Sequence, residues 1–397
     1  MPFAISSFVQ GGYYNFCLSF IFLFLSIGFF VRNVQSITLF KGVWLSLLLV
    51  LLYFSHASVT LFAVMFLFLF AFWFHVIMAD GNFTARFKNF LRSALLLLIV
   101  TMPASVLIFA YAGFHESTSE FIYLNLSELL TMFWRISPLV GHGPGEHPHT
   151  LIYLIVIVFL TGFVTYKVLK NGISAYQWKK EDVLLPAAVI LVIGYFVLPD
   201  GDGSGGYVSK RILYIFFLVL MLRLLLVKIP SWLKVDICIV ALITFYLQLE
   251  NRKIGQAIFT AWAKMTVEAS TFIEPNSTVL PIDQSDVWLS NNLPSYLGVK
   301  KPLVILNNYE ASHFYFPLQW KENPPIHTTW YLYPDPISKR YFSHFDNMKI
   351  LPDYLFFYGY NDLPMPEGYE KSDSADYLLK YELIHQNDFC DLYRIRK

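Results

Sequence analysis

The sequence has little charge and little cysteine, and it contains no acidic residue before Asp80. Only 14% of its 397 residues are charged, whereas an ordinary soluble domain has roughly 25%. Its three cysteines cannot form a disulfide framework, and they lack the spacing of a metal site. The net charge is +1, so the composition gives no argument for a nucleic-acid partner. These shortages argue against a water-soluble chain and exclude one held together by disulfides.

The chain is instead rich in apolar and aromatic residues. Hydrophobic residues make up 56% of the chain, and phenylalanine alone occurs 38 times. Before Glu250 the apolar residues form eight runs near the ~20 residues that a helix needs to cross a bilayer. Two of the runs share one tract, which Ser55 and His56 interrupt. The runs lie at 13–31, 42–78 (two helices), 93–112, 151–166, 183–198, 212–227 and 232–249. We therefore expect residues 1–250 to form a bundle of about eight transmembrane helices.

Basic residues are distributed unequally between the loops that join these runs. Cytoplasmic loops retain Lys and Arg, and one set of alternate loops holds twelve of them, whereas the other holds three. The set of three is Arg135, Lys210 and Arg211. The larger set is Arg32, Lys41, Arg86, Lys88, Arg92, Lys167, Lys170, Lys179, Lys180, Arg223, Lys228 and Lys234. This bias places the N-terminus, the turn at His56, the loops 113–150 and 200–210, and everything after Glu250 on the outer side.

Residues 251–397 have the composition of a water-soluble domain. Brief apolar runs bounded by Pro, Asn or Asp are typical of short buried strands. Five such runs occur, and the last two are close enough to form a hairpin; they are NSTVLPID, KPLVILNN, DYLFFYGYND, ADYLLKYELIHQ and DFCDLYRIRK. The stretch SDVWLSNNLPSYLG predicts a short helix after the first strand. We expect a small mixed α/β domain outside the membrane.

Histidine and carboxylate side chains gather in the expected outer loops. His142, Glu146 and His147 lie close together in VGHGPGEHPHT, and His56 also faces outward. Imidazoles beside a carboxylate can bind zinc, but this spacing matches no closed four-ligand pattern. A divalent metal and a polar loop without metal both remain open, and no cofactor is specified. Glu146 is a candidate catalytic carboxylate, and the three histidines are candidate substrate-binding residues.

The stretch LPDGDGSGGYVSKR begins like a calcium loop but does not end like one. Asp200, Asp202 and Ser204 match the first ligand positions of an EF-hand, yet the twelfth position, where a bidentate Glu belongs, is Arg211. Lys210 and Arg211 lie at the outer mouth of an expected membrane helix, against the distribution of positive charge. Cations beside a glycine-rich turn favour an anion. We therefore expect Lys210 and Arg211 to bind phosphate, with Asp200 and Asp202 as nearby acid, base or metal-holding groups.

Whether Lys210 and Arg211 can bind one phosphate together depends on the residue at which the following helix begins. Two adjacent residues of a regular helix point about 100° apart. They would enclose one phosphate only if the helix began at or after them, which would also leave free amide donors at its N-terminus. The alternative is that both side chains reach up to lipid headgroups and serve as a membrane anchor.

Several stretches together resemble a known family. The tract LLYFSHASVTLFAV, the loop LPDGDGSGGYVSKRIL and the segments STVLPID and LVILNNYEASHFYFPLQW are similar to the C-terminal two-thirds of bacterial GT-C-type membrane glycosyltransferases. The resemblance implies a multi-pass protein of the bacterial cytoplasmic membrane that moves a sugar from a polyprenyl-phosphate carrier to a glycan or lipid acceptor at the outer face. It also implies that Lys210 and Arg211 meet the carrier phosphate.

The chain departs from this family in its first part. Family members carry their catalytic carboxylate in the first outer loop, whereas here no acidic residue precedes Asp80, which the charge bias places inside. We expect either a fragment that lacks the catalytic loop or a protein that kept only the scaffold. The alternative function is a non-catalytic membrane assembly or transport protein whose outer domain binds a partner.

The charge bias yields a direct prediction of topology. A reporter enzyme that is active only in the cytoplasm, fused after Lys397, should stay inactive because the C-terminal domain lies outside. The same reporter fused after Arg92, in a loop rich in positive charge, should be active and serves as the control. Activity of the first fusion would reverse the assignment of every loop.

Overall fold

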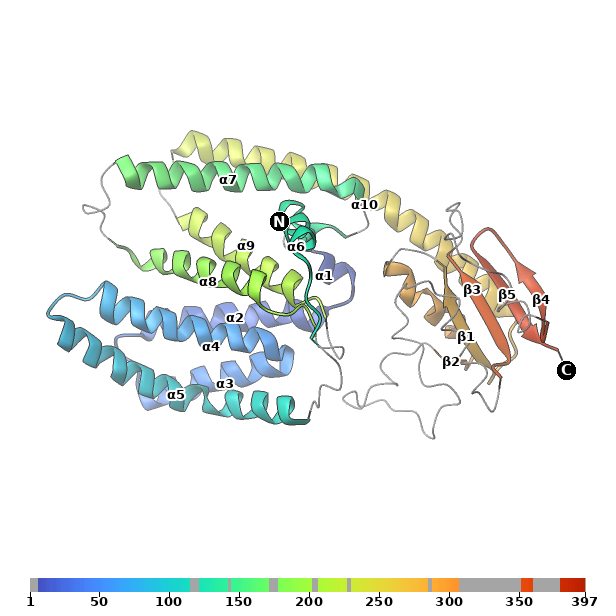
Figure 1. The fold of residues 1–397 in the computed structure, drawn as a ribbon, viewed down its shortest axis with the longest axis horizontal. Coiled ribbons are helices and arrows are strands. Elements are labelled where there is room, and N and C mark those ends of the chain that lie inside the picture. Colours follow the sequence, from blue (N-terminus) through green and yellow to red (C-terminus); the bar gives the residue numbers. More distant parts are fainter. Residues whose placement is uncertain are drawn as a thin grey trace. The chain divides into compact units, whose positions relative to one another are not determined.

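The computed structural model describes most of the chain in two compact units. The units are Met1–Arg252 and Lys253–Lys397, and they meet inside one long helix, α10 (Ser231–Ala269). The described residues are 6–114, 121–141, 144–170, 178–201, 206–226, 230–284, 288–306, 351–359 and 379–396. Figure 1 shows the helices of the first unit and the small sheet of the second. Each unit is considered by itself.

The described residues of the first unit are mostly helical. Its α-helices before α10 are α1 (Ser7–Gln10), α2 (Tyr14–Asn33), α3 (Leu39–Ser55), α4 (Ala57–Phe72), α5 (Phe83–Phe114), α6 (Leu126–Trp134), α7 (His147–Lys170), α8 (Leu184–Val197) and α9 (Val208–Leu226). Three 3₁₀ turns matter below: η3 (Ser137–Leu139), η4 (Pro144–Glu146) and η6 (Lys180–Val183). A π-helical turn, η2 (Trp73–Ile77), extends α4.

Each of the eight expected membrane segments overlaps one of these helices. Five helices are long and apolar enough to cross a bilayer: α2, α4 with η2, α5, α7 and α10. The other three differ in length or charge. The helix α3 is shorter at 17 residues and α8 has 14, while α9 carries Lys210, Arg211 and Arg223. The structure therefore describes a multi-pass membrane protein with at least five helices of spanning length among its described residues.

The break between α3 and α4 lies at the predicted place. The backbone of His56 is extended, with φ −165° and ψ 112°, and its N–H donates to the Leu52 carbonyl at 2.8 Å. The helix therefore stops after Ser55 and restarts at Ala57. Buried leucines on α3 and small or aromatic residues on α4 then pack the two helices into one core. The prediction of two helices joined by a tight turn is confirmed.

The second unit is built on a five-stranded mixed sheet in the order β2-β1-β3-β5-β4. Strands β2, β1 and β3 are parallel, whereas β5 is antiparallel to both β3 and β4. Every strand lies within one of the five segments that the sequence predicts, and the predicted final hairpin is β4–β5. The bounds are β1 (Thr278–Asp283), β2 (Val304–Ile305), β3 (Tyr354–Tyr358), β4 (Tyr381–Gln386) and β5 (Cys390–Ile395).

Strand β1 lies between β2 and β3, and among the described residues β2 pairs only with its first part. The carbonyls of Ser277 and Val279 accept from the N–H groups of Val304 and Leu306, at 3.0 and 2.9 Å. Strand β2 has only two residues, whereas β1 continues to Asp283 and pairs with β3 from Val279 to Asp283. Pro281 lies in this last part of β1, opposite Phe356 of β3. The predicted helix after β1 is present as a 3₁₀ segment, η8 (Trp288–Gly298).

Candidate functional site

The candidate residues fall into two groups within the first unit. Lys210 and Arg211 lie in the first turn of α9, and His56 lies close to Arg211. Glu146 and His147 lie instead where η4 meets α7. His142 and Asp202 are outside the residues that the structure describes, so their predicted roles stay predictions.

Asp200 fixes the start of α9. Its carbonyl accepts from the N–H of Val208 at 3.0 Å, and its carboxylate Oδ1 accepts from the N–H of Ser209 at 2.9 Å. Its own N–H donates to the Ile122 carbonyl at 2.8 Å, which ties the loop before α6 to this turn. Asp200 thus satisfies two of the amides that a helix start leaves open. The structure assigns this carboxylate a helix-capping role.

Two expectations about this helix are therefore wrong. The helix begins at Val208, before Lys210 rather than at or after it. It starts there because Asp200 accepts hydrogen bonds from the N–H groups of its first two residues. The N–H groups of Val208 and Ser209 are thus already bonded. The condition for enclosing a phosphate at the helix start therefore fails, and the two side chains could meet one anion only by converging through their contacts with other elements.

Both side chains pack against an aromatic cluster formed by Phe8, Tyr13 and Phe16. The Lys210 Nζ lies 5.8 Å from the Phe8 ring centroid. The Arg211 guanidinium lies 5.6 Å from the Tyr13 ring and 5.7 Å from the Phe16 ring. The rings of Phe8 and Phe16 are themselves 4.6 Å apart. The two cations therefore converge on one set of aromatic faces, each through a cation–π contact.

The electrostatics of this group follow from burial. Lys210 lies before the expected span 212–227; burial lowers its pKa to about 8, although Asp200 acts in the opposite direction. Burial, and then the positive charge of Arg211, lower the pKa of His56 to about 4, so His56 is neutral at pH 7. The His56 Nδ1 lies 2.9 Å from the Ser58 hydroxyl, and its ring meets Phe16 edge-on at 5.2 Å. The site thus presents two cations beside a neutral imidazole.

Glu146 is the centre of the second group. Its Oε2 accepts from Arg252 Nε at 2.9 Å and from Gln248 Nε2 at 3.1 Å, and its Oε1 accepts from the Gly141 N–H at 3.1 Å. The side chains of Glu146 and Arg252 are only 2% and 3% exposed. Arg252 and Gln248 also donate to the Leu139 carbonyl, at 2.6 and 2.9 Å. We call these four residues, Glu146, Gln248, Arg252 and Leu139, the buried polar cluster.

This arrangement gives Glu146 a structural role, and its predicted catalytic role stays a prediction. A carboxylate that is buried and bonded to a guanidinium, an amide and a backbone N–H does not face a solvent-filled loop, so nothing in its surroundings favours a catalytic role. Its partners satisfy its charge and tie η4 to α10. His147 begins α7 next to it, and its carbonyl accepts from the Thr150 hydroxyl at 3.0 Å. Neither residue lies in the group with Lys210 and Arg211.

A short chain of contacts joins the two groups. Leu139, which accepts the bonds from α10, ends η3, and the carbonyl of Pro138 in η3 accepts from the Ser7 hydroxyl at 3.1 Å. Ser7 begins α1, whose Phe8 lies beneath Lys210. The buried polar cluster thereby supports the aromatic cluster that holds the cations.

Sequence reasoning missed Gln248 and Arg252 and the aromatic residues. Gln248 and Arg252 are four residues apart, which places them on one face of α10, and they are polar residues in or just after an apolar run. That spacing was a usable signal. Phe8, Tyr13 and Phe16 had none, because aromatic residues are abundant throughout this part of the chain.

Comparisons with known proteins and a search for metal ligands add no assignment. No protein-family model, no curated protein and no solved structure matches this chain. Within the described ranges, no group of three or more His, Cys, Asp or Glu side chains could hold a metal ion.

The buried polar cluster yields a prediction of stability. Glu146→Ala should destabilise the first unit by about 3–5 kcal/mol, because it leaves Arg252 buried without its carboxylate. The double change Glu146→Gln with Arg252→Met should recover much of the loss, since it removes both charges. Thermal unfolding in detergent, followed by circular dichroism, measures both variants.

The exposed pair Glu382–Arg394 is the control, because its partners are 45% and 42% exposed. Glu382→Ala should leave the melting temperature unchanged. If Glu146→Ala kept the wild-type melting temperature, the supporting role of Glu146 would be wrong.

Proposed function

We propose that the protein is a membrane glycosyltransferase of GT-C type, or the carrier-binding part of one, whose Lys210 and Arg211 bind the phosphate of a polyprenyl-phosphate carrier. The sugar passes from this carrier to a glycan or lipid acceptor at the outer face of the bacterial cytoplasmic membrane. Eight membrane helices and an outward C-terminal domain belong to the same proposal.

The observation that carries this proposal is that Lys210 is a partly buried cation without an ion-pair partner among the described residues. Its ammonium lies over the Phe8 ring. A buried cation is costly unless an anion lies beside it, and the lowered pKa of Lys210 reflects that cost. Binding a phosphate would relieve it. Arg211, which faces the same aromatic cluster, would add a second charge-assisted contact.

The position of the pair fits a lipid-linked anion better than a soluble one. Lys210 and Arg211 precede the apolar run 212–227 directly. A phosphate at this level of the chain lies at the edge of the hydrocarbon region. A carrier whose apolar chain remains in the bilayer can present its phosphate there. Neutral His56, close to Arg211, can accept or donate one hydrogen bond to the same ligand.

One observation favours the alternative, a non-catalytic membrane assembly or transport protein with a partner-binding outer domain. Two of the three candidate catalytic carboxylates have structural tasks, since Asp200 caps α9 and Glu146 pairs with Arg252. Asp202 is the third and lies outside the described residues. Transfer activity that survives Asp202→Asn would move the catalytic group elsewhere; carrier binding without any transfer would favour the alternative.

Substitution of Arg211 tests phosphate recognition. Arg211→Lys should weaken binding of polyprenyl phosphate by ~1–2 kcal/mol, because Lys loses the bidentate contact, and Arg211→Glu should abolish it. Binding is measured with purified wild type and variants that are folded to the same extent. The control is Arg92→Glu, which changes an exposed cation on α5. Equal affinity of the wild type and both Arg211 variants would leave the pair as a membrane anchor.

The pKa of Lys210 predicts a pH dependence. A lysine with a pKa lowered to about 8 is charged below that pH and neutral above it. Affinity for polyprenyl phosphate should therefore fall as pH rises through about 8, by up to roughly tenfold per pH unit. Lys210→Arg should bind with a flat profile over the same range, because Arg stays charged. A wild-type profile as flat as that of Lys210→Arg would exclude Lys210 from the phosphate site.

A further inference from the structure

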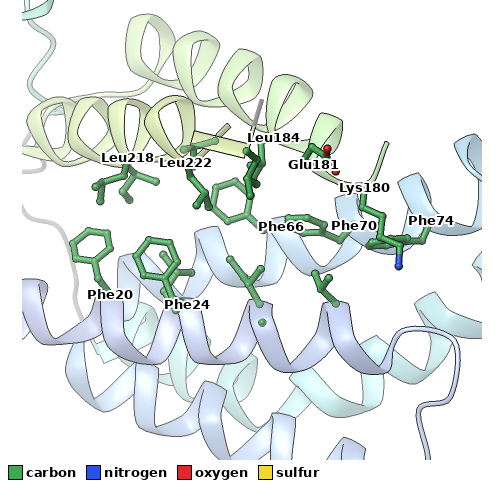
Figure 2. A pocket seen from close by; sticks show the side chains of 17 residues that line it. Phe20, Phe24, Phe66, Phe70, Phe74, Lys180, Glu181, Leu184, Leu218 and Leu222 are labelled. Atoms are coloured by element: carbon green, nitrogen blue, oxygen red, sulfur yellow. The ribbon is translucent and has the colours of Figure 1, made fainter. Parts of the chain in front are cut away.

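An apolar cavity of about 280 Å³ lies between α2, α4 and α9, beside the start of α8. Of its 17 lining residues, Lys180 and Glu181 are the only charged ones. Figure 2 shows these two together at one end of the cavity, with Phe20 and Leu218 at the other end. Along α2 the lining runs from Phe20 to Val31, which is about 16 Å at the rise of an α-helix. The cavity is thus elongated, with one polar end.

The end at Phe20 is closed by aromatic rings. Phe20 meets Phe16 edge-on at 5.0 Å and Tyr214 at 5.2 Å, and all three side chains are buried. A chain that occupies the cavity therefore ends at these rings. Its polar group must lie at the opposite end, where Lys180 and Glu181 are.

The charged end is built on a fixed turn. Asp182 of η6 accepts from the Lys179 N–H at 2.8 Å and pairs with the buried guanidinium of Arg223 on α9. The indole N–H of Trp73 donates to the Lys179 carbonyl at 3.0 Å. Lys180 itself lies over the Phe74 ring at 5.9 Å. These contacts fix the turn that carries Lys180 and Glu181, which both line the cavity.

We propose that this cavity binds one acyl chain of a zwitterionic phospholipid with a primary ammonium, with its phosphate at Lys180 and its ammonium at Glu181. A cation and an anion side by side match a headgroup that carries both charges, whereas an anionic headgroup would meet Glu181 with like charge. An ammonium with N–H groups can also donate to the Glu181 carboxylate, which a quaternary ammonium cannot. The site is separate from the carrier site proposed at Lys210 and Arg211 and does not depend on it.

The volume suits one chain. An engineered cavity of about 150 Å³ binds benzene, so the present one has room for roughly twice as many carbon atoms, on the order of ten to twelve methylenes. That is most of one acyl chain, and the second chain would remain in the bilayer.

Gly28 allows a sharp test. It lines the cavity on α2, and a Cβ atom added there would meet no atom within 4 Å. Gly28→Phe should therefore fill the cavity without removing any existing contact. Gly162→Phe is the matched control, because Gly162 is also helical, has equally open surroundings and lies on α7 away from the cavity.

The experiment is native mass spectrometry of the full-length protein, extracted from nanodiscs that contain equal amounts of phosphatidylethanolamine and phosphatidylglycerol with identical acyl chains. We expect the wild type and Gly162→Phe to retain one phosphatidylethanolamine, and Gly28→Phe to lose it. Lys180→Ala should lower retention roughly tenfold, the size of one lost charge-assisted hydrogen bond. The charge exchange Lys180→Glu with Glu181→Lys should restore part of it.

Three outcomes would overturn the proposal. Equal retention by Gly28→Phe and the wild type would place the lipid elsewhere. Equal retention of both lipids would exclude recognition of the ammonium by Glu181. Displacement of the bound lipid by added polyprenyl phosphate, in the wild type and in Arg211→Glu alike, would assign the cavity to the carrier chain instead.

Discussion

The ion pair between Glu146 and Arg252 is the contact on which the candidate site depends. It buries two charges that are 106 positions apart in the sequence, and such a pair is stable only because further donors and acceptors complete it. Gln248, the Gly141 N–H and the Leu139 carbonyl supply them. Through Leu139 and Pro138 the pair fixes η3, and through Ser7 it fixes α1. A buried charge pair thus determines where Phe8 lies, although Phe8 carries no charge.

The two cations at the start of α9 owe their surroundings to this support. Aromatic faces stabilise a cation without neutralising it, so the contact of Lys210 with Phe8 is compatible with the anion binding that we propose. A carboxylate partner in the same place would have satisfied the charge and removed the reason to bind a ligand. Asp200 is close enough to affect the pKa of Lys210, but its Oδ1 is committed to the N–H of Ser209. Asp200 therefore has a structural task, and the neighbouring Lys210 is the residue to which we assign ligand binding in the proposal.

Local sequence patterns predict much of the fold. Parts of the candidate site could not be predicted, because they depend on contacts between residues far apart in the sequence. The break at His56, the eight helical segments and all five strands follow from runs of apolar residues and the polar residues that interrupt them. The roles of Glu146 and Asp200 do not follow from such patterns. Glu146 looks like a loop carboxylate until Arg252 is placed beside it, and Asp200 caps a helix that begins eight residues later. The pairing of Lys210 with Phe8 likewise needs the turn between α1 and α2, which no local rule specifies.

Pro281 has a consequence for how the C-terminal sheet meets other chains. Successive residues of a strand direct their backbone N–H and C=O groups to opposite sides. Ser277, Val279 and Pro281 are alternate residues, so all three direct these groups toward β2. Strand β2 covers the first two of these positions and stops at Ile305. At the third, where β2 no longer supplies a partner, proline has no N–H to offer. Any strand laid against β1 beyond the described β2 would find no N–H donor at Pro281, so this part of β1 is a poor template for a further strand.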